Sequence, residues 1–200
     1  MKIIDISRTL LKTIEYPGDP KSRHEQVRTI ENGGCNLSAV YACVHTGTHA
    51  DAPCHFIDGG ETIEDADLSK FIGPCTVIEV PQGVISGEYV NRFFPKDCER
   101  LLIKGNGLCH FMDSAAYEAV ELGIKLIGTD ADSVGRAGDQ TEPHRAFLRN
   151  GVAILEGLDL SKVSPGNYFL MAAPVKMGAI DGAPVRAVLV EDYILWNNIK

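Results

Sequence analysis

The sequence is organised around the stretch HTGTHADAPCH, residues 45–55. Three histidines and one aspartate fall within it, and all four have odd numbers. In an extended chain, alternate side chains point to the same side. His45, His49, Asp51 and His55 would then share one face, and Gly47 would leave space near the backbone. The pattern therefore predicts an extended ribbon that gathers four polar side chains.

A helix is the main alternative for this stretch, because it would also align His45 with His49, as in helical zinc sites. Gly47, the neighbouring threonines and Pro53 all disfavour a helix, and residues 37–44 before them are rich in strand formers. A strand end with unrelated surface histidines is the second alternative. Exposed polar residues are common, but nothing about a surface strand gathers them on one side.

Histidine and aspartate provide nitrogen and oxygen ligands, which suit Zn²⁺, Mn²⁺ or related ions. In a catalytic site the ion lowers the pKa of a bound water from about 15.7 towards about 7. The four groups exceed what one open zinc site needs, which indicates either a second ion or a separate acid–base. Cys54 lies among them at an even position, so we interpret it as a packing residue.

Length and composition indicate an ordinary globular protein. The chain has 200 residues, 44% hydrophobic and 23% charged, which predicts one domain over residues 1–200. A net charge of −8 argues against a nucleic-acid partner. No apolar run approaches the roughly 18–20 residues of a membrane span, and we expect no signal peptide. The six cysteines form no C-x-x-C pair, so we expect reduced thiols and a cytoplasmic location.

The remaining pattern predicts a mixed α/β domain. Strands are expected at residues 2–7, 25–30, 37–44, 75–80, 100–104, 124–128, 152–155, 168–172 and 185–190. Helices are expected at residues 62–71, 88–94, 114–122 and 141–150. The order strand, helix, strand over residues 100–128 indicates a parallel βαβ crossover. Asp130 and Asp132 follow that unit, and we interpret them as capping or structural residues because no histidine accompanies them.

The motif of residues 45–55 resembles the signature of the cyclase family of metal-dependent hydrolases, which includes bacterial kynurenine formamidases and isatin hydrolase. The similarity extends over nearly the full chain, through Pro17-Gly18-Asp19, Gly128-Thr129-Asp130, Glu142-Pro143-His144, residues 154–160 and residues 183–187. The resemblance implies an α/β fold of the swivelling β/β/α type, a single domain with a mixed sheet. It also implies a homo-oligomer, either a homodimer or a homotetramer.

The resemblance implies a ligand set for two ions. His45, His49 and Asp51 would hold one ion. Asp51 would bridge to a second ion, completed by His144 and Glu156, and Glu156 would contact both. From the residues alone, His144 reads as a surface helix residue and Glu156 as a strand-end carboxylate, so their roles rest on the resemblance. The implied cofactor is Zn²⁺, two per subunit, with Mn²⁺ as the alternative.

The resemblance further implies that His55 is the general acid–base in hydrolysis of a small amide. The expected reaction converts N-formyl-L-kynurenine to L-kynurenine and formate. Two departures concern the substrate. Tyr16 stands where the formamidases usually have a tryptophan of the substrate pocket, although the turn around it, taken by itself, favours simple packing. Arg145 stands where the family often has a second histidine, which could favour an anionic substrate.

Three other functions are consistent with the sequence. The first is hydrolysis of another cyclic amide, an isatin-like ring or a lactone, which the departures at Tyr16 and Arg145 favour. The second is a metal-binding protein that does not catalyse, against which His55 weighs because it exceeds the needs of metal binding. The third is a cysteine-dependent hydrolase, for which nothing distinguishes one cysteine.

Overall fold

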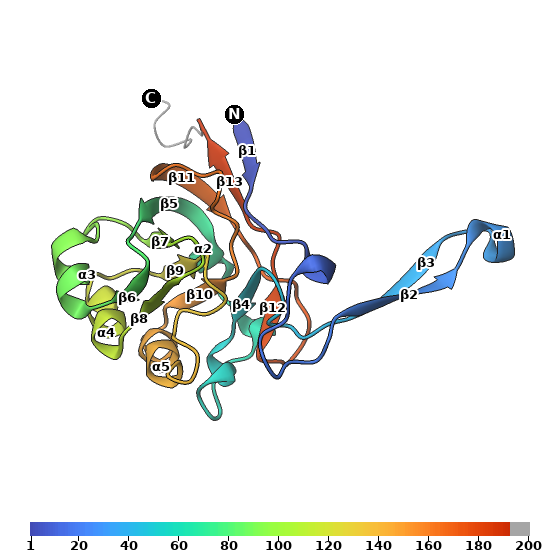
Figure 1. The fold of residues 1–200 in the computed structure, drawn as a ribbon, viewed down its shortest axis with the longest axis horizontal. Helices are drawn as coiled ribbons and strands as arrows, with labels where there is room; N and C mark the ends of the chain where they lie inside the picture. The colour runs from blue at the N-terminus through green and yellow to red at the C-terminus, as the bar shows by residue number, and fades with distance from the viewer. Residues whose placement is uncertain (193–200) are drawn as a thin grey trace.

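A nine-stranded mixed sheet runs through the protein in the order β1-β13-β11-β5-β7-β9-β10-β4-β12. The computed structural model describes residues 1–192, and Figure 1 shows their arrangement. The strands, in sheet order, are β1 (Lys2–Asp5), β13 (Val188–Glu191), β11 (Gly166–Met171), β5 (Ile72–Glu79), β7 (Arg100–Lys104), β9 (Leu126–Thr129), β10 (Ala153–Glu156), β4 (His49–Asp51) and β12 (Gly182–Pro184).

The middle of the sheet is parallel and its two edges are antiparallel. β5, β7, β9 and β10 pair in parallel, whereas β4 and β12 continue the sheet beyond β10 in antiparallel pairs. The crossover predicted over residues 100–128 is confirmed, because β7 and β9 are parallel neighbours with a helix between them. The predicted α/β class with a mixed sheet is also confirmed.

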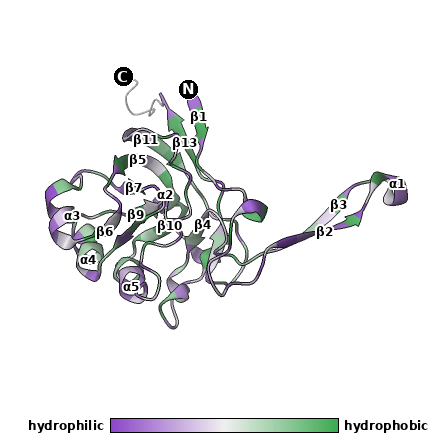
Figure 2. Ribbon diagram, in the orientation of Figure 1, coloured by the Kyte–Doolittle hydropathy of each residue, from purple (hydrophilic) through white to green (hydrophobic). Residues whose placement is uncertain are grey.

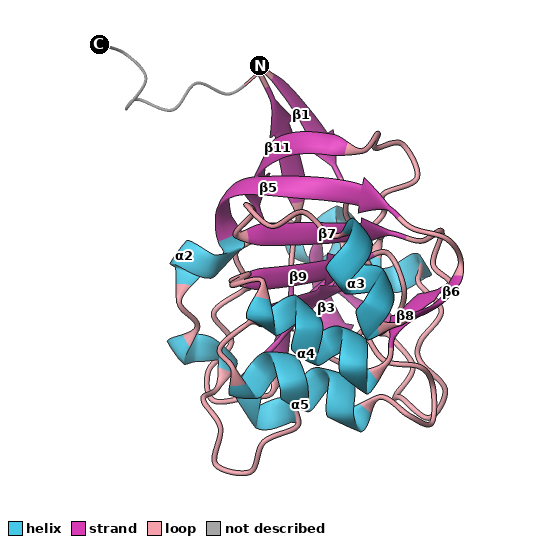
Figure 3. Cartoon of the chain, turned by 90° about the vertical axis from the view of Figure 1, so that its left-hand side faces the viewer, coloured by secondary structure: helices cyan, strands magenta, loops and turns pink. Residues whose placement is uncertain are grey.

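Three helices cover one face of the sheet: α3 (Gly87–Phe93), α4 (Asp113–Glu121) and α5 (Thr141–Arg149) (Figure 3). The side chains of β7 pack into two apolar clusters, one on each face of the sheet. Leu101 and Ile103 lie in the apolar cluster under the helices, and Leu102 lies in the cluster on the opposite face. Each such fully buried side chain contributes roughly 1.5–3 kcal/mol to stability. Accordingly, the strands of the large sheet are largely apolar in Figure 2.

Short elements account for most differences from the predicted pattern. The single helix predicted at residues 62–71 is two pieces, the 3-10 turn Ile63–Asp65 and α2 (Leu68–Phe71). Of the strand predicted at residues 185–190, only residues 188–190 are in a strand, as part of β13. The pair β6 (Gly83–Ile85) and β8 (Cys109–Phe111) was not predicted, because three-residue strands are too short to show a period. Among residues 1–192, no helix is long and apolar enough to cross a bilayer.

A hairpin arm projects from the body of the protein (Figure 1). It consists of β2 (Arg23–Arg28) and β3 (Leu37–Tyr41), with the one-turn helix α1 (Ile30–Gly33) at its tip. All residues of both strands are exposed, including Val27 and Val40. The chain leaves the body for the arm shortly after Tyr16 and returns to the body shortly before His45. These two residues line the same cavity, described below.

Candidate functional site

Strand pairing between β4 and β10 brings three of the predicted site residues together. His49 and Asp51 are two positions apart on β4, so their side chains share one face, as the odd-number pattern predicts. Glu156 ends β10 and stands directly opposite His49 in the antiparallel register. His49 Nε2 lies 3.4 Å from both Asp51 Oδ1 and Glu156 Oε2. All three side chains are buried.

His45 and His55 reach the same place by another route, which corrects the prediction of one extended ribbon. Only residues 49–51 of the motif form a strand. His45 lies in a turn closed by Gly47, whose φ of 75° is the left-handed conformation that glycine adopts most easily. His55 ends the 3-10 turn Pro53–His55, where proline fits the first position. The clustering is therefore as predicted, but two of its four members depend on turns.

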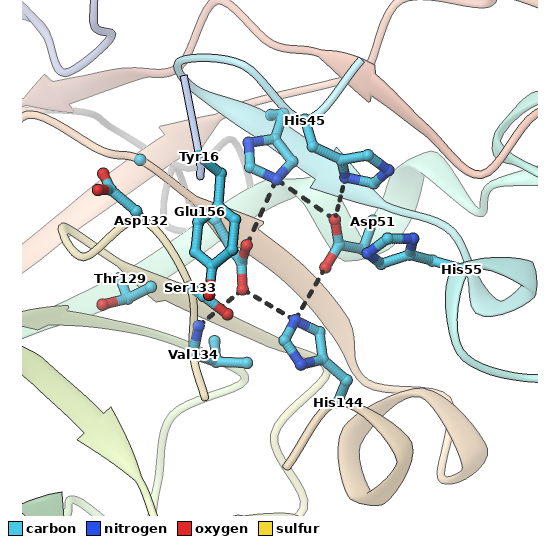
Figure 4. Close-up of polar contacts among 12 residues, drawn as sticks. Tyr16, His45, Asp51, His55, Thr129, Asp132, Ser133, Val134, His144 and Glu156 are labelled. Carbon is cyan, nitrogen blue, oxygen red and sulfur yellow. Dashed lines mark hydrogen bonds and ion pairs between the residues drawn. The ribbon is translucent and has the colours of Figure 1, made fainter. Parts of the chain in front are cut away.

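His144 enters the site from α5 and is 2% exposed, so it is not the surface residue that the local sequence indicates. Its Nδ1 lies 2.6 Å from the Gln140 carbonyl oxygen. Its Nε2 lies 3.1 Å from Glu156 Oε1 and 3.5 Å from Asp51 Oδ2. Figure 4 shows the three side chains of Asp51, His144 and Glu156 pointing toward one another. Phe56 stacks on the imidazole with ring centroids 4.2 Å apart.

The hydrogen bonds leave the buried imidazoles of His49 and His144 with lone pairs that face carboxylates. His49 Nδ1 lies 3.0 Å from the Gly47 carbonyl oxygen, and a carbonyl can only accept a hydrogen bond. Its Nε2 therefore has no proton of its own in the neutral ring, and the same reasoning applies to His144. His49 Nε2 and Asp51 Oδ2 are buried without a hydrogen-bond partner. Opposed acceptors of this kind need a cation between them.

Two donor sets that share Asp51 fit such cations. His45, His49 and Asp51 form one set, and Asp51, His144 and Glu156 form the other, with the ligand atoms of each set within 4.8 Å of one another. Imidazole nitrogen and carboxylate oxygen are ordinary ligands of Zn²⁺ and Mn²⁺. The residues present therefore fit a pair of divalent cations bridged by one carboxylate.

The carboxylates also set the charge of the site. Burial alone would lower the pKa of His49, but the carboxylates of Asp51 and Glu156 outweigh it and raise that pKa to about 10. Burial is likewise outweighed at His144, whose pKa Glu156 raises to about 9. Burial opposes ionisation of Asp51, yet the neighbouring imidazoles of His45 and His49 hold its pKa well below the usual value. The buried centre is thus built to hold positive charge.

His55 differs from the other histidines. Its side chain is 27% exposed, and it stacks on His45 with ring centroids 4.0 Å apart. Burial lowers the pKa of His55, and the charge of Asp51 only partly opposes that shift. A neutral imidazole at the edge of the centre can accept a proton and later return it.

A cavity of about 100 Å³, open to solvent, lies over the centre. Its lining residues are Tyr16, Asp19, His45, His49, His55, Asp132, Ser133, Gln140, His144 and Glu156. Tyr16 is therefore part of the cavity wall and does not simply pack on the body. Its hydroxyl donates to Gln140 Oε1 at 3.2 Å. Arg145 is not among the lining residues and instead pairs with Glu142, at 3.1 Å, so its proposed preference for anionic substrates has no structural support.

The predictions for the flanking residues have mixed outcomes. Asp130 is structural as predicted, because its Oδ1 accepts a hydrogen bond from the Gly105 amide at 2.9 Å. Asp132 pairs with Arg8, but it also lines the cavity. Cys54 packs against the apolar core, as predicted, although it does so from a 3-10 turn and not from an extended strand.

Besides those of Gln140 described above, further contacts of the site were not predicted. Asp181 lies 3.1 Å from His45, and the Val134 amide donates to Glu156 Oε1 at 2.7 Å. Phe56 covers His144, as described above. Asp181 lies two residues before the segment 183–187 that carries the family resemblance, which was the one signal for it. Backbone amides such as that of Val134 leave no mark in a sequence.

The family model and the similar proteins that match this chain agree with one another. The family model described as "Putative cyclase" matches residues 4–106. A kynurenine formamidase of Salinibacter ruber is 34% identical over 206 residues, which cover 94% of this chain and 97% of the relative. A kynurenine formamidase of Bacillus thuringiensis subsp. konkukian is 34% identical over 200 residues, which cover 93% and 96% of the two chains.

Solved structures share the fold. A structure described as a predicted metal-dependent hydrolase from Bacillus stearothermophilus has a TM-score of 0.82 at 28% identity and covers 94% of this chain and 97% of its own. Isatin hydrolase A from Labrenzia aggregata has a TM-score of 0.79 at 20% identity, with 94% and 93% coverage, which shows likeness of fold.

Proposed function

This chain belongs to the cyclase family, and on that premise we propose that it hydrolyses N-formyl-L-kynurenine to L-kynurenine and formate with the help of divalent metal ions. One observation carries the proposal. Two buried donor sets share Asp51 and lie beside His55 at the floor of a cavity. Full-length relatives named kynurenine formamidase support the choice of substrate.

We assign the ligands as follows. His45, His49 and Asp51 would hold one ion. Asp51 would also bind a second ion, together with His144 and Glu156. Zn²⁺, two per subunit, is our choice, with Mn²⁺ as the alternative, since both accept this ligand set. Ions bound there supply an activated water molecule and polarise the substrate carbonyl.

His55 would carry the proton in this reaction. Hydrolysis forms a bond between the formyl carbon and a water oxygen and breaks the bond from that carbon to nitrogen. The nitrogen must gain a proton as it leaves, and a neutral imidazole at the cavity edge can take one from water and deliver it. The ring of Tyr16 would contact the substrate from the cavity wall, held in place by Gln140.

A second candidate substrate is an isatin-like ring, another cyclic amide or a lactone. The observation that favours it is Tyr16, which lies in the cavity wall and has a smaller ring than the tryptophan usual in formamidases. A role in metal binding without catalysis is the alternative of another class. His55 lines the cavity beside the two donor sets that share Asp51 but belongs to neither set. This placement argues for catalysis.

We further propose that the chain forms one domain over residues 1–200 and assembles as a homodimer or homotetramer. One continuous sheet joins β1 near the start to β13 near the end, which supports a single domain. The exposed arm supports assembly, because an isolated two-stranded hairpin is marginally stable in water. Its apolar side chains are 46–66% exposed, at Val27, Ile30, Leu37, Val40 and Tyr41.

A substrate panel tests the proposed reaction. The purified protein is stripped with a chelator, reloaded with Zn²⁺ or Mn²⁺, and assayed with N-formyl-L-kynurenine, isatin and simple lactones. We expect the highest kcat/KM for N-formyl-L-kynurenine and no turnover in the stripped protein. A higher kcat/KM for isatin or a lactone would favour the second candidate. Absence of turnover with every compound, despite full metal loading, would favour the non-catalytic alternative.

A further inference from the structure

Asp181 connects the two histidines to which we give different roles. Its Oδ2 lies 3.1 Å from His45 Nε2 and 3.4 Å from His55 Nδ1. The two imidazole rings stack with centroids 4.0 Å apart and planes 23° from parallel. One carboxylate oxygen therefore faces both a metal-ligand candidate and the acid–base candidate. Its distance to His55 is that of an ion pair, and catalytic contacts of this kind commonly tighten when substrate binds.

The fold holds Asp181 in this place through its backbone. The Asp181 carbonyl accepts a hydrogen bond from the Ala52 amide at 2.9 Å. The next residue, Gly182, allows β12 to approach the site, because a Cβ there would lie 2.8 Å from His45 Cε1 and 2.9 Å from the Ala50 carbonyl oxygen. Any larger residue would push the strand away from His45. The carboxylate is thus positioned by a strand edge that requires glycine beside it.

We infer that Asp181 is a positioning residue for proton transfer, which orients His55 by accepting its Nδ1–H; this inference rests on the proposed function. A neutral imidazole has one N–H, so a proton held on Nδ1 leaves the Nε2 lone pair free. Nε2 takes a proton from water, and the resulting imidazolium faces the Asp181 carboxylate. The ring then delivers that proton to the leaving nitrogen and returns to its neutral form.

The same oxygen acts on His45. By accepting the Nε2–H of His45, Asp181 leaves Nδ1 of that ring free on the side of Asp51, 3.1 Å away. Carboxylates behind a metal-ligand histidine commonly orient the ring in this way. A test must therefore separate loss of metal from loss of proton transfer.

Leaving-group dependence separates these effects. N-formyl-L-kynurenine needs a protonated leaving nitrogen, whereas 4-nitrophenyl formate releases a phenolate that needs no proton. For Asp181→Asn loaded with Zn²⁺ we expect kcat on N-formyl-L-kynurenine to fall about 10–100-fold, the usual effect of losing an outer partner of such a site. We expect KM to stay within about 3-fold. We expect kcat on the ester to fall by a smaller factor than on N-formyl-L-kynurenine, because the ester uses only the first of the two proton transfers of His55. Asp181→Glu should recover part of the loss.

Asp97→Asn is the matched control, because Asp97 is exposed and lies outside the residues that line the cavity. It removes the same charge and should match the wild-type protein on both substrates. Equal losses on both substrates in Asp181→Asn would overturn the inference in favour of a structural role. Loss of one bound metal equivalent, measured by elemental analysis, would overturn it in favour of a ligand role.

A second measurement does not depend on activity. Two-bond ¹H–¹⁵N correlation spectra of the Zn²⁺-loaded protein report which imidazole nitrogen carries the proton, and His55→Gln assigns the signal. We expect the Nδ1–H form of His55 in the wild-type protein and a shift towards the Nε2–H form in Asp181→Ala. An Nε2–H form in the wild-type protein would refute the inference. Failure of the proposed function is recognised separately, as wild-type inactivity towards N-formyl-L-kynurenine.

Discussion

Glu156 faces His49 across the antiparallel pair of β10 and β4, and His49 Nε2 lies 3.4 Å from Glu156 Oε2. This one register joins the histidine-rich motif to a carboxylate far along the chain. Asp51, two residues beyond His49 on the same face, then lies between Glu156, His144 and His45. The central position of Asp51 leads to the first prediction.

Asp51→Asn is expected to lose both metal ions, because its carboxylate belongs to both donor sets. Asparagine has nearly the same shape, so the fold should be kept and circular dichroism should be unchanged. Elemental analysis after gel filtration measures the result. His144→Ala is the matched comparison and should lose only one ion per subunit. Two retained ions in Asp51→Asn would contradict the shared-ligand arrangement.

His55→Ala is expected to keep its metal and to lose turnover. Removing a general acid–base costs about 10²–10⁴ in kcat. Steady-state assays with N-formyl-L-kynurenine measure the loss, and elemental analysis of the same sample shows whether metal is retained. Wild-type kcat in this variant would remove His55 from the mechanism.

Metal binding to the chelator-stripped protein is expected to release protons at pH 7.5. His49 and His144 have pKa values raised to about 10 and about 9, so both carry protons at that pH, and a metal ion binds only the neutral imidazole. Affinity should therefore increase as the pH rises towards 9. Titration calorimetry in two buffers of different ionisation enthalpy counts the protons. Identical heats in both buffers would show that none are released.

Tyr16→Ala is expected to raise KM for the substrate about 10-fold with little change in kcat, because Tyr16 lines the cavity but lies outside the two donor sets. Tyr16→Phe is the control. It removes only the hydrogen bond to Gln140, worth about 0.5–1.5 kcal/mol, and should change KM by less than the alanine variant. A fall in kcat alone in Tyr16→Ala would argue against a substrate contact.

Replacement of residues 24–40 by a short glycine–serine turn is expected to reduce the assembly to monomers, because it removes most of the apolar side chains exposed on the arm. Light scattering coupled to gel filtration measures the mass. Val40→Ser together with Leu37→Ser tests the same surface with the arm intact. An unchanged mass in both variants would show that assembly uses another surface.

The sequence by itself determined the chemical character of this protein. The residue types of the 45–55 motif define a nitrogen and oxygen ligand set, and the alternation on β4 places His49 and Asp51 on one face. The sequence pattern also identified β7, α4 and α5 close to their observed bounds. These features are local, because neighbouring residues alone decide residue chemistry, strand alternation and helix propensity.

Only the tertiary structure decided which distant residues complete the site. His144 and Glu156 look ordinary in their own segments, and the family resemblance alone pointed to them. Asp181 had no assigned role at all. Their meeting depends on the order β10-β4-β12 in the sheet and on the Gln140–His144 contact at the start of α5. It also depends on the turn at Gly47 and on the close approach of β12 at Gly182. Such pairings join residues far apart in the chain, and no local pattern records them, because their free energy comes from contacts that exist only once the sheet has formed.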